Sequence, residues 1–302
     1  MLIQCFALLS FLGSVLSHWQ SCDCGLENPI ANPSSLSKYP WLVLIQYDIP
    51  TGGRVSCAGT LISNQHIATS ASCLYLGENG VRPDRLQVYL GPYSLTDLPI
   101  PVKVRNYFVH HLFKNDANYD RTGADIAFLT LDTELPRETM PICIANDGQN
   151  KPFSESPLKA IGWTGDGEYM ASDPVEMNMN MISEYDCFSM RKGSGGLLKR
   201  LQFMLPIDSK YDVPQTDFCA LNDSKSSIGC LWNSGAPLMW KNPKNHRWYL
   251  VGINSRGRSV CRDQMPKNPG MFTDVPKYFE QFSGRVTNEM PQFCPSSYDK
   301  LN

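Results

Sequence analysis

Alternation of apolar and polar positions dominates the chain and predicts many short β-strands. Runs such as "WLVLIQY" from Trp41, "LQVYLG" from Leu86 and "VKVRNYFV" from Val102 are rich in β-branched and aromatic residues, which strands favour. Clusters of Gly, Pro, Asn and Asp separate the runs and are typical of turns. Because such runs recur as far as residue 255, the pattern predicts an all-β sandwich or barrel.

Helical patterns are few. The segment "VPKYFEQFSGRV", residues 275–286, places Pro276 at a helix start and gathers apolar side chains on one side, so it predicts a C-terminal helix. The run "VEMNMNMISEYDCFSM", residues 175–190, alternates Met with Asn and predicts a half-buried strand followed by a short helix. We interpret its methionines as core fillers rather than metal ligands. Residues 148–157, "GQNKPFSESP", form the best linker and divide the β material into two similar halves.

The N-terminal run "MLIQCFALLSFLGSVLS" predicts a secretory signal peptide over residues 1–17. Small residues Val15 and Ser17 stand at the offsets for cleavage after Ser17, although the usual basic start is missing. A membrane anchor is the alternative, but the run is shorter than the ~20 residues that a spanning helix needs. No later segment is long and apolar enough to span a bilayer, so we expect a soluble, secreted protein without a transmembrane segment.

Charge and cysteine content narrow the function classes. The formal net charge is -2, which gives no case for nucleic acid or a broadly anionic partner. Of 11 cysteines, Cys5 lies in the predicted signal peptide, and the remaining even number favours disulfides in an exported protein. The close pair Cys22 and Cys24 is spaced too tightly for a zinc knuckle and has no histidine beside it, so we expect no metal and no cofactor.

The order of motifs resembles that of the trypsin-like serine protease family. "YPWLVLIQ" is similar to the family's Pro-Trp-x-Val strand, and "CAGTLISNQHIATSASC" to the segment that runs from Cys-Gly-Gly to Thr-Ala-Ala-His-Cys. "ADIAFLTL", "AIGWTGDG" and "NPGMFTDVPKYFEQF" are similar to the family's Asn-Asp-Ile-Ala, Thr-Gly-Trp-Gly and Pro-Gly-Val-Tyr-Thr segments. Correct order over residues 38–284 is far more specific than any single motif.

This resemblance implies an all-β fold of two six-stranded antiparallel β-barrels, with a cleft between them and a C-terminal helix. The chain then divides into a signal peptide at 1–17, an N-terminal segment at 18–37, a trypsin-like peptidase domain at 38–284 and a C-terminal tail at 285–302. The two barrels of the peptidase domain divide near 148–157.

The resemblance also implies a set of disulfides. Four pairs follow from it: Cys57–Cys73, Cys187–Cys219, Cys230–Cys261 and Cys24–Cys143. One family bridge is missing at both ends, because Leu158 and Trp240 stand at its two positions. Cys22 and Cys294 remain, and they pair either with each other or with another chain.

Catalysis in this family needs a nucleophilic serine, a histidine base, a buried aspartate and backbone donors for the oxyanion. Asp125 and Ser234 stand at the aspartate and serine positions, but Ser72 stands at the histidine position. A serine hydroxyl is a very poor base, and we expect the Ser72 side chain to be too short to bridge the other two groups. Losing the base costs on the order of 10⁶ in turnover, so the resemblance implies an inactive member.

No other histidine is expected to replace the missing base. His66 precedes Ser72 on the strand that leads to the site, His110 and His111 match a surface loop, and His246 lies between two closing strands. His18 falls near the N-terminus.

The remaining site positions also differ from the family pattern. Trp232 replaces the glycine whose amide helps to hold the oxyanion. Asn233 replaces the aspartate that pairs with the new N-terminal ammonium on activation, and a buried carboxylate without that cation would be destabilising. Ile228 falls at the floor of the primary specificity pocket, where a trypsin-like enzyme holds an acid.

The leading interpretation is a secreted, catalytically inactive serine protease homologue that acts by protein binding. Such homologues serve as scaffolds, decoys or cofactors, and many degenerate mammalian members belong to the male reproductive tract, which the resemblance implies here as well. The partner would be an extracellular protein of unknown identity. One alternative stays open, a serine hydrolase with a rearranged mechanism that uses Ser234 and Asp125 without a histidine.

A third interpretation is an extracellular protein that binds an anionic glycan. Arg256, Arg258 and Arg262 in "RGRSVCRD" lie near the expected cleft rim, although arginines on a solvated loop more often have no such role. Separately, the tripeptide that starts at Asn222 matches a glycosylation acceptor, a pattern that also arises by chance.

Overall fold

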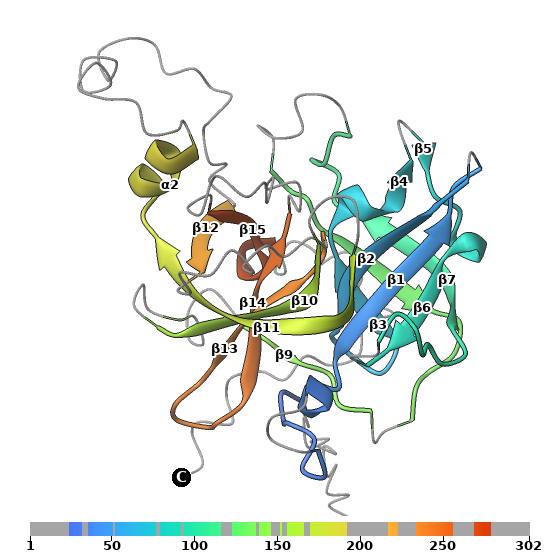
Figure 1. Cartoon of the computed structure of the whole chain (residues 1–302), viewed down its shortest axis with the longest axis horizontal. Helices are drawn as coiled ribbons and strands as arrows, with labels where there is room; N and C mark the ends of the chain where they lie inside the picture. The colour runs from blue at the N-terminus through green and yellow to red at the C-terminus, as the bar shows by residue number, and fades with distance from the viewer. Residues whose placement is uncertain are drawn as a thin grey trace, which may run out of the picture.

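The computed structural model describes much of the chain, and all structural statements below refer to the part it describes. The described residues are 24–31, 36–50, 52–76, 79–91, 94–115, 123–136, 139–145, 152, 156–165, 170–191, 217–222, 234–255 and 269–278. They form two β-barrels that lie beside each other (Figure 1).

The first barrel is built from the N-terminal half of the chain. Its strands are β1 (Leu42–Asp48), β2 (Arg54–Leu61), β3 (His66–Thr69), β6 (Gln87–Leu90), β7 (Val102–Val109) and β8 (Ala127–Leu131). They close in the order β1-β2-β3-β8-β7-β6. The residues of β1 are buried from Leu42 to Tyr47. Because neighbouring side chains of a strand point to opposite faces, continuous burial means that both faces of β1 are covered.

The second barrel is built from the C-terminal half. Its strands are β10 (Leu158–Gly165), β11 (Met170–Ile182), β12 (Asp217–Asn222), β13 (Pro237–Lys241), β14 (Trp248–Asn254) and β15 (Gly270–Asp274). The additional pairing of β13 with β14 closes this sheet, and β9 (Cys143–Ile144) adds to β14 as a parallel strand. The prediction of two six-stranded antiparallel barrels is therefore confirmed.

Short elements connect these strands. They are η1 (Leu36–Lys38), η2 (Ala71–Leu74), β4 (Tyr75–Leu76), β5 (Asn79–Gly80), η3 (Pro83–Arg85) and α2 (Glu184–Arg191). The Met-rich run forms the predicted strand and helix, β11 and α2. Met177 and Met179 are buried, whereas Asn178 and Asn180 are exposed, which agrees with a core-filling role for the methionines. A helical turn follows β15 at 275–278, where the C-terminal helix is predicted.

Three disulfides lie among the described residues. They are Cys24–Cys143, Cys57–Cys73 and Cys187–Cys219, all among the pairs that the resemblance implies. At the position of the missing family bridge, Leu158 lies opposite Trp240 in the β10–β13 register, and both side chains are buried. An apolar contact thus occupies the place of that bridge. The predicted pairs Cys230–Cys261 and Cys22–Cys294 lie outside the described residues.

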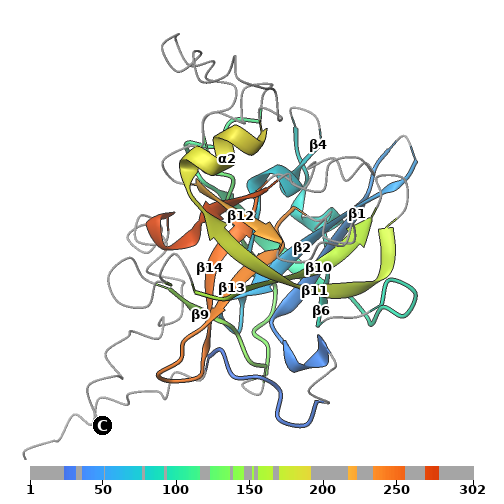
Figure 2. The same ribbon diagram turned by 60° about the vertical axis from the view of Figure 1, so that its left-hand side comes forward.

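The N-terminal segment packs against the second barrel near the β13–β14 turn (Figure 2). Gly25 donates its amide hydrogen to Pro141 O at 2.7 Å and accepts one from Trp248 N at 2.9 Å. The Glu27 carboxylate accepts hydrogen bonds from Lys241 Nζ at 2.9 Å and from Trp248 Nε1 at 2.8 Å. Together with Cys24–Cys143, these bonds fix the segment onto the sheet.

Glu176 of β11 connects the second barrel to the residues just before β1. Its carboxylate accepts a hydrogen bond from Tyr39 OH at 2.8 Å, contacts Lys159 Nζ, and lies 3.2 Å from Lys38 Nζ. Burial favours the neutral form of Glu176, but the hydrogen bonds from Lys159 and Tyr39 outweigh it and hold the pKa of this carboxyl below its ordinary value. Burial and the neighbouring carboxylate raise the pKa of Tyr39.

Replacing Glu176 should weaken the fold in a pH-dependent way. Because the folded-state pKa of Glu176 is lowered, its contribution is present above the unfolded-state pKa of about 4.3 and is lost as pH falls through the folded-state value. We expect Glu176→Gln to lower the free energy of unfolding by about 1–3 kcal/mol at pH 7. The difference from wild type should shrink below about pH 4.3, as measured by urea unfolding across pH.

Glu134→Gln is the matched control, because Glu134 is exposed and its contact with Asn64 Nδ2 is long at 3.5 Å. It should change stability by less than about 0.5 kcal/mol. An effect of Glu176→Gln that stays constant from pH 7 to pH 3 would contradict the ionic role of this carboxylate.

The two barrels approach closely at Gly235, just before β13. Ala58 N of β2 donates to Ser234 O at 3.0 Å, so backbone from both barrels is in direct contact. Gly235 has a φ of +88°, and a Cβ atom there would overlap Ala58 O and Thr69 Oγ1 of the first barrel. Only glycine therefore fits this junction.

Gly235→Ala should accordingly be severely destabilising. We expect a loss of about 3 kcal/mol or more in the free energy of unfolding, from left-handed backbone strain added to overpacking. Gly52→Ala is the matched control, because Gly52 has a similar φ of +89° but no atom within 4 Å of an added Cβ. It should cost only about 1 kcal/mol. Equal losses in the two variants, measured by urea unfolding, would show that the barrels do not meet at Gly235 as described.

Candidate active site

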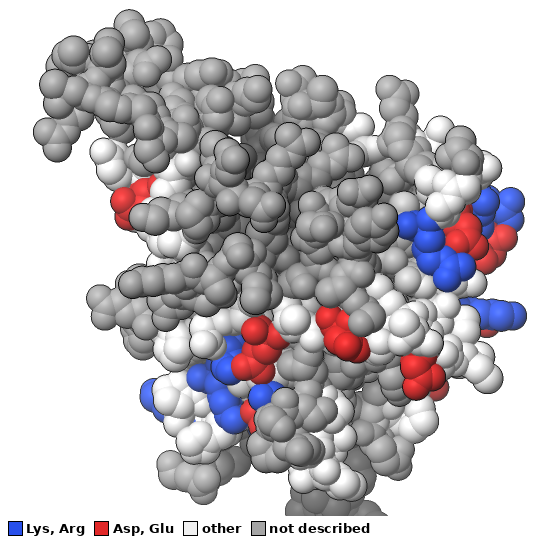
Figure 3. Space-filling view, in the orientation of Figure 1, with Lys and Arg blue, Asp and Glu red and all other residues white. Residues whose placement is uncertain are grey.

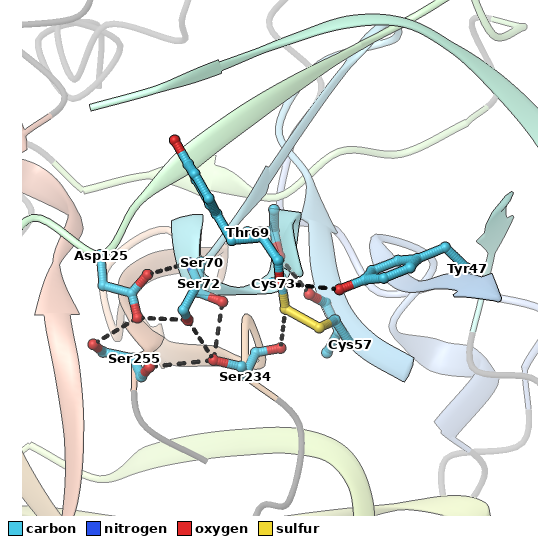
Figure 4. Close-up of a disulfide and its surroundings, with 11 residues drawn as sticks. Tyr47, Cys57, Thr69, Ser70, Ser72, Cys73, Asp125, Ser234 and Ser255 are labelled. Carbon is cyan, nitrogen blue, oxygen red and sulfur yellow. Dashed lines mark hydrogen bonds between the residues drawn. A yellow bond between two sulfur atoms is a disulfide. The ribbon is translucent and has the colours of Figure 1, made fainter. Parts of the chain in front are cut away.

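Ser72, Asp125 and Ser234 meet at the junction of the two barrels (Figure 4). Ser72 lies on η2, the short helix that follows β3, and Asp125 lies two residues before β8. Ser234 lies in the turn that leads into β13, so the second barrel supplies it. The three positions that the resemblance assigns to a catalytic triad are thus brought together.

The Asp125 carboxylate is buried, with 1% of its surface exposed, and it is surrounded by donors. Ser72 N donates to Oδ1 at 2.7 Å, and Ser72 Oγ donates to Oδ2 at 2.8 Å. Ser255 Oγ, from the end of β14, donates to the same Oδ2 at 2.9 Å. Hydrogen bonds to an ionised acceptor are stronger than neutral ones, so these donors compensate for the water that the carboxylate loses on burial.

The Ser234 hydroxyl lies among other hydroxyls. Ser70 Oγ donates to Ser234 Oγ at 3.0 Å, Ser72 Oγ lies 3.1 Å from it, and Ser234 Oγ donates to Ser255 O at 3.2 Å. The expectation that Ser72 is too short to bridge Asp125 and Ser234 is therefore wrong. The Ser234 side chain is directed toward Ser72, so the two hydroxyls touch without an intervening ring (Figure 4).

The hydrogens of this network are oriented toward the carboxylate. Each hydroxyl has one hydrogen to donate. Ser72 and Ser255 direct theirs to Asp125, and Ser70 directs its own to Ser234. The Ser234 hydrogen is then shared between Ser72 Oγ and Ser255 O. Among the described residues, the network consists of hydroxyls, amide and carbonyl groups and one carboxylate, and it contains no imidazole.

The described histidines lie elsewhere in the first barrel and in the β13–β14 turn. His66 pairs with Thr130 in the β3–β8 register, at the end of β3 remote from Ser72, and its Nδ1 lies 2.9 Å from Ser63 Oγ. His246 lies in the turn between β13 and β14 with a φ of +58°. His18 is outside the described residues.

His110 departs from the surface position expected for it. Only 2% of it is exposed, and its ring lies 4.5 Å from that of His111 and 4.8 Å from that of Tyr278. Tyr278 comes from the helical turn after β15, so a residue distant in sequence covers the ring. In the described part of the chain, no histidine nitrogen is hydrogen-bonded to Ser234 Oγ.

Two members of the network, Ser70 and Ser255, were not predicted. Ser70 stands where the family motif quoted above has the first alanine of Thr-Ala-Ala-His-Cys, so the sequence did contain a signal for it. Ser255 ends the run "WYLVGINS", and only the contact with Asp125 reveals its role. Both side chains are buried, at 0% and 1% exposure.

Several other candidate residues are not placed. Trp232, Asn233, Ile228 and the arginines at 256, 258 and 262 lie outside the described residues. Asn222 is half-buried at the end of β12, opposite Met179 of β11, and its glycosylation stays a prediction.

Charged side chains on the face shown in Figure 3 lie in groups of mixed sign rather than in a patch of one sign. Opposite charges also pair among the described residues, where Arg54 lies 2.8 Å from Asp48 and Arg82 lies 2.6 Å from Asp84. Among the described residues, no group of three or more His, Cys, Asp or Glu side chains could hold a metal ion. No helix in this part of the chain is long and apolar enough to cross a membrane.

Comparison with known proteins agrees with the fold. Residues 31–281 match the family model described as Trypsin, so the chain belongs to the trypsin family of serine proteases.

Similar proteins within this class come from insects. The chain is 24% identical to CLIP domain-containing serine protease B4 of Anopheles gambiae, over 94% of the chain and 78% of that protein. It is 24% identical to CLIP domain-containing serine protease HP8 of Bombyx mori, over 85% of the chain and 70% of that protein. A venom serine protease of Polistes dominula is 22% identical, over 89% of the chain and 91% of that protein.

Proposed function

We propose that this member of the trypsin family is a secreted, catalytically inactive homologue that acts by binding an extracellular protein. The observation that carries the proposal is the direct contact of Ser72 with both Asp125 and Ser234, in the place where an active member needs an imidazole.

A hydroxyl cannot perform the task of the imidazole. The base must take the proton of the nucleophilic serine and later give it to the leaving group, which requires a group that titrates near the working pH. Ser72 has no such group, and its hydrogen is directed to Asp125. Without the base, turnover falls by on the order of 10⁶, which leaves no useful protease activity.

The sequence around Ser234 supports the same proposal. Trp232 stands in place of the glycine that the resemblance assigns to the oxyanion hole, and Asn233 in place of the aspartate assigned to activation. A bulky indole beside the oxyanion amide would crowd the tetrahedral intermediate. Base, oxyanion hole and activation switch thus differ from the family pattern together.

Binding is the function left to a scaffold that has kept its fold. The two barrels remain closed and the described disulfides are formed, so the loops around the junction rest on a rigid support. Disulfides of this kind form in oxidising compartments, which supports secretion, as does the predicted signal peptide. We propose a role as scaffold, decoy or cofactor for another extracellular protein.

One observation favours a second candidate, a serine hydrolase without histidine. Ser234, Ser72 and Asp125 form a continuous hydrogen-bonded path, along which the Ser234 proton could pass to the carboxylate. In this alternative Asp125 would be the final base and Ser72 a relay, with Ser234 as the nucleophile. Covalent labelling distinguishes the two candidates.

A serine-reactive fluorophosphonate probe should leave Ser234 unmodified. We expect no adduct by intact-mass spectrometry under conditions that label trypsin to completion, because Ser234 has no base to activate it. Adding free imidazole should not rescue labelling, since Ser72 Oγ and Ser234 Oγ touch at 3.1 Å and leave no space for a ring between them.

The matched control is Ser234→Ala, which removes the candidate nucleophile. A partner captured from the native secretion with the wild-type protein should also be captured with this variant, because binding needs no nucleophile. Stoichiometric adduct formation at Ser234 that disappears in Ser234→Ala would overturn the proposed function in favour of the hydrolase.

A further inference from the structure

We infer that the former triad has become an inter-barrel clamp, a set of hydrogen bonds that holds the two barrels in one orientation. The clamp consists of Ser70, Ser72 and Asp125 from the first barrel and of Ser234 and Ser255 from the second. This structural role goes beyond the proposed function and gives Ser234 and Asp125 a task that needs no catalysis.

Three side-chain hydrogen bonds of the clamp cross the junction. Ser70 Oγ donates to Ser234 Oγ at 3.0 Å, Ser72 Oγ and Ser234 Oγ lie 3.1 Å apart, and Ser255 Oγ donates to Asp125 Oδ2 at 2.9 Å. Each of these bonds joins a residue of one barrel to a residue of the other. Separating or rotating the barrels would therefore break all three together.

Hydrogen bonds within the first barrel position Ser72 and Asp125 for the contacts that cross the junction. Ser72 donates both its amide and its hydroxyl hydrogen to Asp125, which fixes the two side chains relative to each other. Main-chain contacts across the junction support the same orientation, because Ala58 N donates to Ser234 O at 3.0 Å and Thr273 Oγ1 donates to Asp125 O at 3.2 Å.

No disulfide among the described residues joins the two barrels at this point. Cys57–Cys73 lies within the first barrel, and Cys187–Cys219 joins α2 to β12 of the second. Cys24–Cys143 holds the N-terminal segment on β9. Among the described residues, the bonds that join the barrels at the junction are hydrogen bonds.

The clamp is cooperative because three of its residues, Ser70, Asp125 and Ser255, are buried, whereas Ser72 and Ser234 are half-buried. A buried polar group that loses its partner cannot turn to water instead. Removing the Ser234 hydroxyl thus takes the acceptor away from the buried Ser70 hydroxyl in the other barrel. Members of one hydrogen-bonded network should accordingly show coupled, non-additive effects on stability.

Ser70 is the residue that distinguishes the clamp from a site that has merely lost its base. Its hydroxyl donates to Ser234 Oγ from the buried side of the junction, a contact independent of Ser72. The clamp agrees with the proposed function in one respect, because the Ser234 hydroxyl, bonded to Ser70 Oγ and Ser255 O, acts as a structural group rather than as a free nucleophile.

A double-mutant cycle with Ser70→Ala and Ser234→Ala tests the clamp in the secreted protein with its disulfides intact. Each single variant should raise the equilibrium constant for unfolding by about tenfold, since each removes the part-buried hydrogen bond between Ser70 and Ser234, and Ser234→Ala also takes this acceptor away from the buried Ser70 hydroxyl. In the double variant, the increase in the equilibrium constant for unfolding should be about fivefold smaller than the product of the two single-variant increases. A double-variant increase within about twofold of that product would overturn the clamp.

Hydrogen exchange gives a readout that general destabilisation does not share. The amide of Ala58 donates across the junction to Ser234 O, whereas the amide of Leu131 donates to Gln65 O inside the first barrel. In Ser70→Ala, exchange at Ala58 should accelerate at least about fivefold more than at Leu131. Parallel acceleration at both amides would also contradict the clamp.

Ser56→Ala is the matched control, because it removes a part-buried hydroxyl bond, from Gln46 Nε2 at 2.9 Å, within the first barrel. It should leave the ratio of Ala58 to Leu131 exchange unchanged. The cycle and the labelling experiment fail independently: an adduct at Ser234 with intact coupling would refute only the proposed function. Additive changes in the free energy of unfolding in the double-mutant cycle, without an adduct at Ser234, would refute only the clamp.

Discussion

The buried carboxylate of Asp125 constrains the whole junction between the barrels. A charge at 1% exposure is costly unless donors surround it, and its donors come from both barrels. Ser72 supplies two hydrogens from the first barrel and Ser255 supplies one from the second. These three donors surround the carboxylate together in this orientation of the barrels, which also places Ser234 against Ser70 and Ser72.

This constraint connects the fold to the geometry of the candidate active site. In a trypsin-family site the aspartate orients an imidazole, whereas here it orients a hydroxyl that reaches Ser234 directly. The same carboxylate thus fixes the side chain that contacts Ser234. Gly235 lets the backbone of Ser234 approach Ala58, so the hydroxyls of the two barrels come within bonding distance. The contact between the barrels and the position of Ser72 against Ser234 thus share one cause.

Much of the fold and of the candidate site could be predicted from the sequence, because strand alternation and the motifs that carry the family resemblance can be read from short segments. Strand alternation predicted an all-β fold and the Met-rich strand with its helix, whereas the family resemblance implied the two barrels and the shared site of Ser72, Asp125 and Ser234. The direct bridge by Ser72 was missed, since side-chain length was considered without the direction of the Ser234 side chain. The burial of His110 and the contacts of Glu176 were also missed, because Tyr278 and Tyr39 reach them from distant parts of the chain.

A crystal structure of the protein tests the central claim most directly, through the separation of Ser72 Oγ and Ser234 Oγ. The account predicts a contact near 3.1 Å, with Ser70 Oγ and Ser72 Oγ both hydrogen-bonded to Ser234 and no solvent between them. A Ser234 side chain turned away from Ser72 and Ser70, with water or another base hydrogen-bonded to its hydroxyl, would contradict it.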